Sequence, residues 1–170
     1  VTLHRPSNVD QENTLRPLLE ILRDVSEKLT LIFALHPRTR ANIERFSLGD
    51  LVASERIVLL PPQGYLEMLG LMYSAKLVLT DSGGLQEETT ALGIPCLTIR
   101  ENTERPITVE HGTNTMVGSN RAAILKGVDE ILAGGGKCGR IPEYWDGKAA
   151  ERIAADMAQW LISSLLQTRQ

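Results

Sequence analysis

Cysteine is scarce in this chain, which contains two, Cys96 and Cys138, among 170 residues. Cys96 lies in an apolar run and Cys138 in a glycine-rich loop, without a CxxC motif and without a histidine at ligand spacing. This pattern argues against a structural disulfide and against a metal site, and it is typical of proteins of the reducing cytosol. We therefore expect a cytoplasmic protein that binds no metal.

Long hydrophobic runs and a strong net charge are missing as well. No stretch reaches the roughly 18 consecutive apolar residues that predict a membrane span, and no basic and then apolar leader opens the sequence. The 21 acidic and 18 basic residues give a net charge of -3, so we expect neither a membrane nor a nucleic-acid partner. Because the chain starts at Val1 inside an apolar stretch without Met, we interpret it as a piece of a longer protein.

The hydrophobic residues, 42% of the chain, occur in short runs that alternate with helical patterns. Leucines recur at steps of three and four over residues 15–22, which predicts one face of a helix, and residues 66–73 and 124–131 repeat this spacing. The continuously apolar runs are typical of strands that helices cover on both faces. These runs are residues 1–3, 31–35, 57–60, 77–80, 95–99 and 116–117. The alternation predicts an α/β fold, a Rossmann-like parallel sheet with helices on both faces.

We divide the chain into a lobe, residues 1–146, and a C-terminal segment, residues 147–170. The segment is predicted to form an amphipathic helix from about residue 148 to residue 166. Its apolar positions include Ala150, Ile153, Met157, Trp160 and Leu161. Two interpretations stay open, because the helix can pack on a neighbouring lobe as well as its own or cover the sheet of its own lobe alone.

Residues 77–88 carry the clearest sign of a ligand site. An apolar strand ends there, and Ser82, Gly83 and Gly84 open a helix. Glycines let a ligand approach the backbone closely, and the free N–H groups and the dipole of a helix start attract an anion. We therefore expect a phosphate at these three residues.

Glu88 lies one turn further along the same helix. A carboxylate at that place suits the two hydroxyls of a ribose, so we expect Glu88 to bind a nucleotide and not to act as a base. The alternative is a plain turn in which Ser82 caps the helix and Glu87 and Glu88 offset its dipole.

Charged and imidazole side chains follow other predicted strands. His4 and Arg5 follow the first strand, His36 follows the second, and Arg105 belongs to a charged loop after the fifth. The carboxyl ends of parallel strands meet at one edge, where open α/β sheets bind ligands. Each residue alone is explained by a solvated strand end, a turn or a solvated loop. Their convergence on one edge favours a shared site, in which a His followed by an Arg suits a diphosphate leaving group.

Four motifs occur in order along the chain, at residues 2–5, 79–88, 102–114 and 146–150. Together they resemble the non-hydrolysing UDP-N-acetylglucosamine 2-epimerases. The resemblance spans nearly the whole chain, but it covers only the C-terminal half of that family.

The resemblance implies one lobe of a GT-B architecture, in which a nucleotide sugar lies between two Rossmann-like lobes. It implies interconversion of UDP-GlcNAc and UDP-ManNAc, for cell-envelope polysaccharides, without a cofactor or a metal. A proton leaves C2 of the sugar as UDP leaves C1, and UDP adds back with the opposite configuration at C2. The implied residues are Ser82, Gly83 and Gly84 for the phosphates, Glu88 for the ribose, His4 for the departing diphosphate, Gln63 beside uracil, and Arg105 for the sugar-diphosphate. Arg5 is a further candidate for substrate binding, from its place directly after His4.

The resemblance also implies partners. The N-terminal lobe of the same protein supplies the acid and base carboxylates at C2, and family members are commonly homodimers. Many are regulated by a second UDP-GlcNAc that touches the equivalents of Arg5 and His36. Here Pro6 and Ser7 follow Arg5 where bacterial members usually have Arg and Glu, which leaves regulation open.

On this interpretation the chain binds half of the ligand and is inactive alone. Three alternatives stay open from the sequence. A GT-B glycosyltransferase that uses a UDP-sugar would share the fold and the nucleotide site. A hydrolysing epimerase would release free ManNAc and UDP, and a non-catalytic module would bind the nucleotide only.

Overall fold

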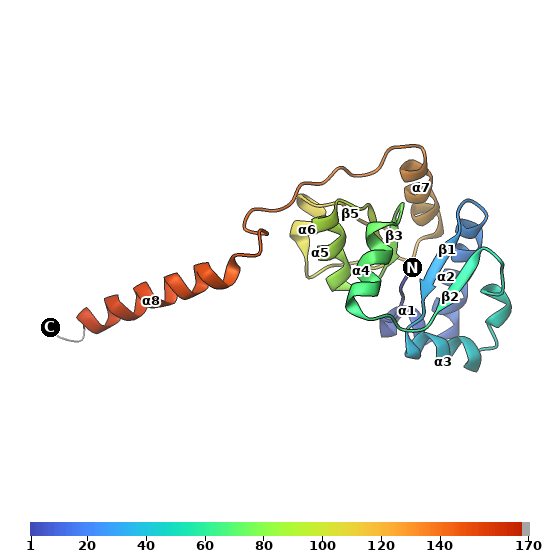
Figure 1. The fold of residues 1–170 in the computed structure, drawn as a ribbon. Helices are drawn as coiled ribbons and strands as arrows, with labels where there is room; N and C mark the ends of the chain where they lie inside the picture. The colour runs from blue at the N-terminus through green and yellow to red at the C-terminus, as the bar shows by residue number, and fades with distance from the viewer. Residues whose placement is uncertain (168–170) are drawn as a thin grey trace. The chain divides into compact units, whose positions relative to one another are not determined.

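The computed structural model of the chain describes residues 1–167. The chain divides into two units, Val1–Arg140 and a second unit that begins at Ile141. Within the described residues, the first unit holds the strands and helices α1 to α7, and the second holds helix α8. Figure 1 traces the chain from blue at the N-terminus to red at the C-terminus.

Parallel strand pairs form the centre of the first unit. β1 (Leu31–Ala34) pairs with β2 (Ile57–Leu60). β3 (Val78–Thr80) pairs with β4 (Cys96–Thr98), which pairs in turn with β5 (Asn114–Met116). Every one of these pairings is parallel, as the alternation of apolar runs and helical patterns predicts.

The first residues of the chain join these two groups of strands. Val1 N donates to Ile32 O at 2.7 Å, and Val1 O accepts from Ala34 N at 3.1 Å. On the other side, Thr2 forms a parallel bridge with Thr80. The spatial order is therefore β2, β1, residues 1–3, β3, β4 and β5, which is the order of a Rossmann sheet.

Helices alternate with the strands along the chain. Their bounds are α1 (Pro6–Val9), α2 (Glu12–Ser26), α3 (Pro37–Arg45), the 3-10 turn η1 (Gly49–Leu51), α4 (Tyr65–Tyr73), α5 (Gly83–Leu92), α6 (Pro106–Glu110) and α7 (Arg121–Leu132). The three patterns with helical spacing are α2, α4 and α7, so those predictions are confirmed. The predicted α/β class with a Rossmann-like parallel sheet is confirmed as well.

The predicted strands after β2 differ in their bounds from the observed ones, and the largest difference is at β5. The run at residues 116–117 overlaps β5 at Met116, and β5 begins two residues earlier at Asn114. Asn114 is a buried polar residue, so hydrophobicity gives no sign of the strand start. Residues 1–3 lie in the sheet as expected, with Thr2 forming an isolated bridge.

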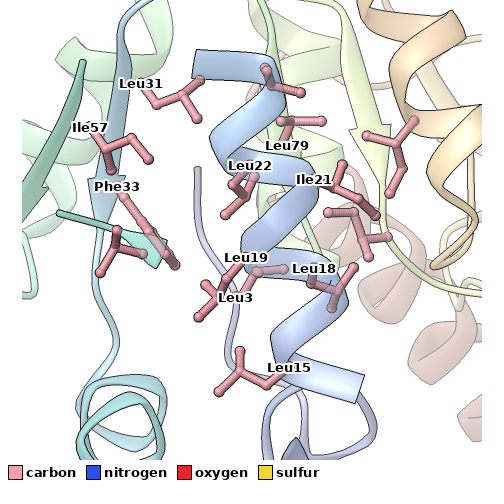
Figure 2. Packing of buried hydrophobic residues seen from close by; sticks show 14 of the residues in the cluster. Leu3, Leu15, Leu18, Leu19, Ile21, Leu22, Leu31, Phe33, Ile57 and Leu79 are labelled. Atoms are coloured by element: carbon pink, nitrogen blue, oxygen red, sulfur yellow. The ribbon is translucent and has the colours of Figure 1, made fainter. Parts of the chain in front are cut away.

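The core lies between α2 and the sheet. Figure 2 shows Leu19 and Leu22 of α2 pointing toward Phe33 of β1, with Leu31 and Ile57 nearby. All five are buried, and a fully buried apolar side chain of this size contributes about 1.5–3 kcal/mol. This packing holds the strands rigid, and their carboxyl ends are therefore fixed in place.

The second unit consists of a short irregular stretch and α8 (Ala149–Gln167), which matches the predicted helix to within one residue at each end. Asp146 lies just before its start, where Lys148 N donates to Asp146 Oδ1 at 3.1 Å and Arg152 pairs with the same carboxylate at 2.5 Å. The hydrogen bond from Arg152 lowers the pKa of Asp146 to about 2. The apolar side chains at the predicted positions Ile153, Met157, Trp160 and Leu161 are exposed.

Within residues 1–167, no helix combines the length and the apolar character needed to cross a membrane. Both cysteines are free thiols, Cys96 buried in β4 and Cys138 exposed. Burial raises the pKa of Cys96 to about 11, so this thiol stays protonated at neutral pH and is a poor nucleophile.

Candidate functional site

The candidate site lies where the winding of the sheet reverses. Residues 1–3 and β3 are neighbours, but the chain leaves the first toward β1 and β2 and leaves the second toward β4 and β5. Connections that part in this way leave a crevice at the carboxyl ends of the two strands, and open α/β sheets bind ligands there. His4 and Arg5 follow one strand at this crevice, and Asp81 and Ser82 follow the other.

Asp81 connects the two strand ends. Its side chain is fully buried, and its carboxylate accepts hydrogen bonds from His4 N (3.0 Å), Arg5 N (2.9 Å) and Asn8 Nδ2 (3.1 Å). Nδ1 of the His4 ring lies 3.0 Å from Asp81 Oδ1. Burial alone would raise the pKa of Asp81, but the hydrogen bonds from the His4 ring and from the amides of Arg5 and His4 lower it below its usual value. The carboxylate is therefore ionised, and it fixes the position of His4.

Sequence reasoning did not single out Asp81 as a site residue. The signal was present, because a carboxylate that directly follows a continuously apolar strand has to find donors or a ligand when it is buried. Its donors are 73 to 77 residues away in the chain, so the sequence alone does not name them.

Ser82 is the N-cap of α5, and Gly83 and Gly84 form its first turn. The described structure shows no capping bond from the Ser82 side chain, so it does not support the alternative in which the Ser82 hydroxyl caps the helix. The Ser82 amide donates to Thr80 Oγ1 at 3.0 Å, which leaves its hydroxyl as the group open to a ligand. The amides from Gly83 to Leu85 have no acceptor within a helix, because the first turn lacks preceding carbonyls. These N–H groups and the helix dipole favour an anion.

The fold does not require glycine at Gly83 or Gly84. Neither has a positive φ. Among the described residues, a Cβ on Gly84 would meet no atom within 4 Å, and one on Gly83 would make ordinary contacts with Arg5 Nη2 (3.8 Å) and Glu104 Oε2 (4.0 Å). A helical glycine costs roughly 0.5–1 kcal/mol relative to Ala. Two adjacent glycines therefore weaken the helix start without relieving any crowding, which favours a ligand as the reason for them.

The two carboxylates of α5 differ in their surroundings. Glu87 Oε1 lies 2.8 Å from Arg105 Nε, an ion pair without hydrogen-bond alignment. Glu88 is half-buried, and residues 1–167 provide no hydrogen bond or ion pair to its carboxylate. Burial, and then the charge of Glu87, raise the pKa of Glu88. Glu88 is thus the carboxylate of this helix that is free to accept hydrogen bonds from a ligand.

A buried polar network holds the loop after β4 against α5. Gln86 Oε1 accepts from Thr103 Oγ1 (2.6 Å) and from Asn114 Nδ2 (3.0 Å), and Gln86 Nε2 donates to Ser82 O (3.1 Å). Asn114 Oδ1 accepts in turn from Thr98 Oγ1 at 2.6 Å. Gln86, Asn114 and Thr98 are fully buried, and an unpaired group at such a place costs about 1–3 kcal/mol. The network therefore fixes the loop that carries Arg105. The sequence did not predict this network, because buried polar residues follow no hydrophobic periodicity.

Arg100 in the same loop is fixed by a bidentate pair with Glu104. Both N–H···O distances are 2.8 Å, and the Arg100 side chain is 11% exposed. The hydrogen bond from Arg100 lowers the pKa of Glu104 to about 2. A hollow of about 560 Å³ opens beside this pair, and its lining includes Arg5, Ser7, Asn8, Arg100, Asn102 and Ser119. Guanidinium groups from two strand ends thus border one concave surface.

His36 follows β1, and Gln63 follows β2. The ring centroid of His36 lies 5.4 Å from that of His4, so the structure brings these two residues together. His36 also caps α3, because its Nδ1 accepts from Arg38 N at 3.1 Å. Gln63 follows β2, which β1 and residues 1–3 separate from β3, and its Nε2 donates to Pro61 O at 2.7 Å. Gln63 therefore lies apart from the group around Asp81.

The site combines an oriented imidazole, guanidinium groups, a helix start with free amides and an unpaired carboxylate. Such a set suits a nucleoside diphosphate, whose phosphates need donors and whose ribose needs an acceptor. Within the part of the chain that the structure describes, no three His, Cys, Asp or Glu side chains are placed to hold a metal ion.

Comparison with known proteins decides the family. A family profile described as UDP-N-acetylglucosamine 2-epimerase matches residues 1–158 of the chain. The chain belongs to the UDP-N-acetylglucosamine 2-epimerase family. The resemblance inferred from the four motifs is therefore confirmed.

The relatives of this epimerase-family chain agree in sequence and in structure. The UDP-N-acetylglucosamine 2-epimerase of Methanocaldococcus jannaschii is 43% identical over 156 residues, which are 90% of this chain and 42% of the relative. The UDP-2,3-diacetamido-2,3-dideoxy-D-glucuronate 2-epimerase of Pseudomonas aeruginosa is 38% identical over 163 residues, 93% of this chain and 43% of the relative. The crystal structure of the M. jannaschii enzyme in complex with UDP-GlcNAc and UDP has a TM-score of 0.81 at 40% identity and covers 93% of this chain.

This epimerase-family chain spans less than half the length of these relatives, 44% in the case of the crystal structure. The likeness to that structure confirms the predicted fold class, a Rossmann-like lobe of a GT-B architecture.

Proposed function

We propose that this chain is the nucleotide-binding half of a UDP-N-acetylglucosamine 2-epimerase, an isomerase that interconverts UDP-GlcNAc and UDP-ManNAc. One observation carries the proposal. The buried Asp81 carboxylate fixes His4 and Arg5 at the crevice where α5 begins, so that donors from two strand ends face the same ligand. The family membership and the M. jannaschii complex with UDP-GlcNAc and UDP support this choice of ligand.

The diphosphate is proposed to bind at the start of α5. Ser82 Oγ and the amides of Gly83 and Gly84 would donate to its oxygens, and Arg5 lies close by, since its Nη2 would be 3.8 Å from a Cβ on Gly83. Glu88, whose carboxylate is unpaired within residues 1–167, would accept hydrogen bonds from the ribose hydroxyls. Charge-assisted bonds of this kind contribute about 1.5–3 kcal/mol each.

The other contacts are proposed from the family resemblance. The backbone around Gln63 would face uracil, and Arg105 would face the sugar-diphosphate. A second UDP-GlcNAc on Arg5 and His36, as regulator, is a further prediction from the resemblance.

In the proposed reaction, a carboxylate base of the N-terminal lobe removes the proton from C2. The C2–H electron pair forms the C1=C2 double bond of a glycal, and the electron pair of the C1–O bond leaves with UDP. His4 would donate a hydrogen bond to the diphosphate oxygen on which negative charge grows, and this stabilises the transition state more than the ground state. UDP then adds back to C1, and a proton returns to C2 on the opposite face.

The experiment that tests this function supplies UDP-GlcNAc to the intact protein without any acceptor. An epimerase forms UDP-ManNAc, with one solvent deuteron at C2 when the reaction is run in deuterium oxide. Free ManNAc with UDP would indicate a hydrolysing epimerase, and turnover that begins only after an acceptor sugar is added would indicate a glycosyltransferase. Binding without turnover under all these conditions would leave a nucleotide-binding module.

We also propose the assembly and the place of the intact protein. Residues 1–146 would form the UDP-binding lobe, and the exposed apolar side chains of α8, among them Ile153, Met157 and Trp160, would pack on the N-terminal lobe. The intact protein would be a homodimer. It would lie in the cytosol, and the two free cysteines support this location because thiols stay reduced there.

A further inference from the structure

The two ring nitrogens of His4 have different surroundings. Nδ1 lies 3.0 Å from Asp81 Oδ1, and the His4 side chain is 34% exposed while Asp81 is fully buried. The Asp81 carboxylate already accepts hydrogen bonds from His4 N, Arg5 N and Asn8 Nδ2. An ionised carboxylate can only accept, so Nδ1 has to be the donor in this pair. A neutral imidazole carries one N–H, which leaves Nε2 without a proton in that form.

We propose that Asp81 is a positioning residue for the reaction, because it holds His4 in the Nδ1–H form and leaves Nε2 as the nitrogen that meets the diphosphate. The inference rests on the proposed function of the site and adds the protonation state that His4 needs there. A hydrogen bond from Nε2 to the diphosphate requires the imidazolium form, for which the buried Asp81 carboxylate is the counter-ion. Neutral His4 would accept at Nε2 and repel the diphosphate oxygen.

The geometry of the carboxylate predicts what its replacement by an amide does. Asp81 Oδ2 accepts from Arg5 N and Asn8 Nδ2, Oδ1 accepts from the imidazole, and His4 N donates to both oxygens. In Asp81→Asn the amide oxygen has to stay with the N–H donors, which places the new Nδ2–H group at the imidazole. That group donates to Nδ1 of His4, and the ring proton moves to Nε2.

A purely structural role for Asp81 predicts something else. If the carboxylate served only to tie two strand ends together, loss of any of its hydrogen bonds would weaken the fold and leave the tautomer of His4 unchanged. Asn8→Ala is the matched control, because it removes another side-chain donor to Asp81 Oδ2 without touching the imidazole.

The test is the long-range nitrogen–proton NMR spectrum of the histidine rings in the nitrogen-15-labelled chain at a pH where they are neutral. His4→Asn assigns the His4 signals among those of the three histidines. We expect a protonated Nδ1 and an unprotonated Nε2 in the wild type and in Asn8→Ala, and the reverse in Asp81→Asn. A wild-type His4 that carries its proton on Nε2 overturns the proposal without any variant, so the test stands even where Asp81→Asn does not fold.

The intact enzyme gives a second readout. Asp81→Asn removes the counter-ion of the His4 imidazolium and leaves only a neutral Nε2–H donor, so kcat should fall about 10²-fold, while KM for UDP-GlcNAc changes less than tenfold. Unchanged kcat, or an Nδ1–H tautomer that survives in Asp81→Asn, overturns the proposal. Failure of the proposed function looks different, since the wild-type enzyme would then not epimerise UDP-GlcNAc although the tautomer is as expected.

Discussion

Replacing Gly84 with Ala separates the needs of the fold from those of a ligand. Gly84 lies in the first turn of α5, and among the described residues a Cβ there meets no atom within 4 Å. The free energy of unfolding should therefore rise by roughly 0.5–1 kcal/mol, because Ala stabilises a helix by that amount relative to Gly. For a domain of this size, the gain raises Tm by about 1–4 °C.

The same methyl group should impair UDP binding. It occupies the space through which a phosphate approaches the amides of the first turn, so that at least one charge-assisted hydrogen bond, about 1.5–3 kcal/mol, is lost. This corresponds to roughly 10- to 150-fold weaker binding. Isothermal titration calorimetry with UDP and thermal unfolding followed by circular dichroism measure the two effects on the same sample.

Gly70→Ala is the matched control. Gly70 lies inside α4, and a Cβ there also meets no described atom within 4 Å. This variant should raise Tm to a similar extent and leave the affinity for UDP unchanged. If Gly84→Ala raises Tm but binds UDP like the wild type, the glycines do not serve a phosphate. If it lowers Tm, the space at the helix start is not open.

Other predictions concern the ribose, the imidazole and the core. Glu88→Gln should weaken UDP binding about tenfold or more, because its hydrogen bonds to the ribose lose their charge assistance. Binding of inorganic phosphate should stay unchanged. Equal losses of affinity for UDP and for phosphate would point to an effect on the helix dipole instead. Because burial and Glu87 raise the pKa of Glu88, the advantage of the wild type over Glu88→Gln should vanish as the pH falls through that raised pKa, and a constant ratio of affinities would contradict this. His4→Asn in the intact enzyme should lower kcat about 10²-fold or more with little change in UDP affinity, and unaltered single-turnover chemistry at saturation would make His4 a nucleotide anchor only. Leu19→Ala should lower the free energy of unfolding by about 2–5 kcal/mol in urea, and a loss below about 1 kcal/mol would contradict the packing of α2 on Phe33.

The architecture follows from the sequence because hydrophobic spacing reports burial directly. The leucines of α2 recur at the spacing that their contacts with the core demand, and the alternation of strands and helices restricts the topology to a parallel sheet. The apolar runs report burial less well, because Ile32 of β1 and Val58 and Leu59 of β2 are exposed. Hydrophobicity did not predict the start of β5, because Asn114 is a buried polar residue that forms hydrogen bonds with Gln86 and Thr98.

The site was predictable only in part, for a related reason. His4, Arg5 and Ser82 are visible in the sequence because they directly follow apolar runs. Asp81 also follows such a run, but its role depends on donors that the fold brings from more than 70 residues away. Hydrogen-bond partners of a buried polar group are set by tertiary structure, and no local pattern encodes them.

The proposed site for uridine diphosphate is the start of α5, at the crevice where the winding of the sheet reverses. Titration of the nitrogen-15-labelled chain with UDP, followed by amide chemical shifts, tests it most directly. We expect the largest shift changes at Gly83, Gly84 and Leu85, and we expect the amides of His4 and Arg5 to respond with the same dissociation constant. The proposed site would be contradicted if the largest shift changes occurred at α7 or at the amino ends of β1 and β2 while the first turn of α5 was unaffected.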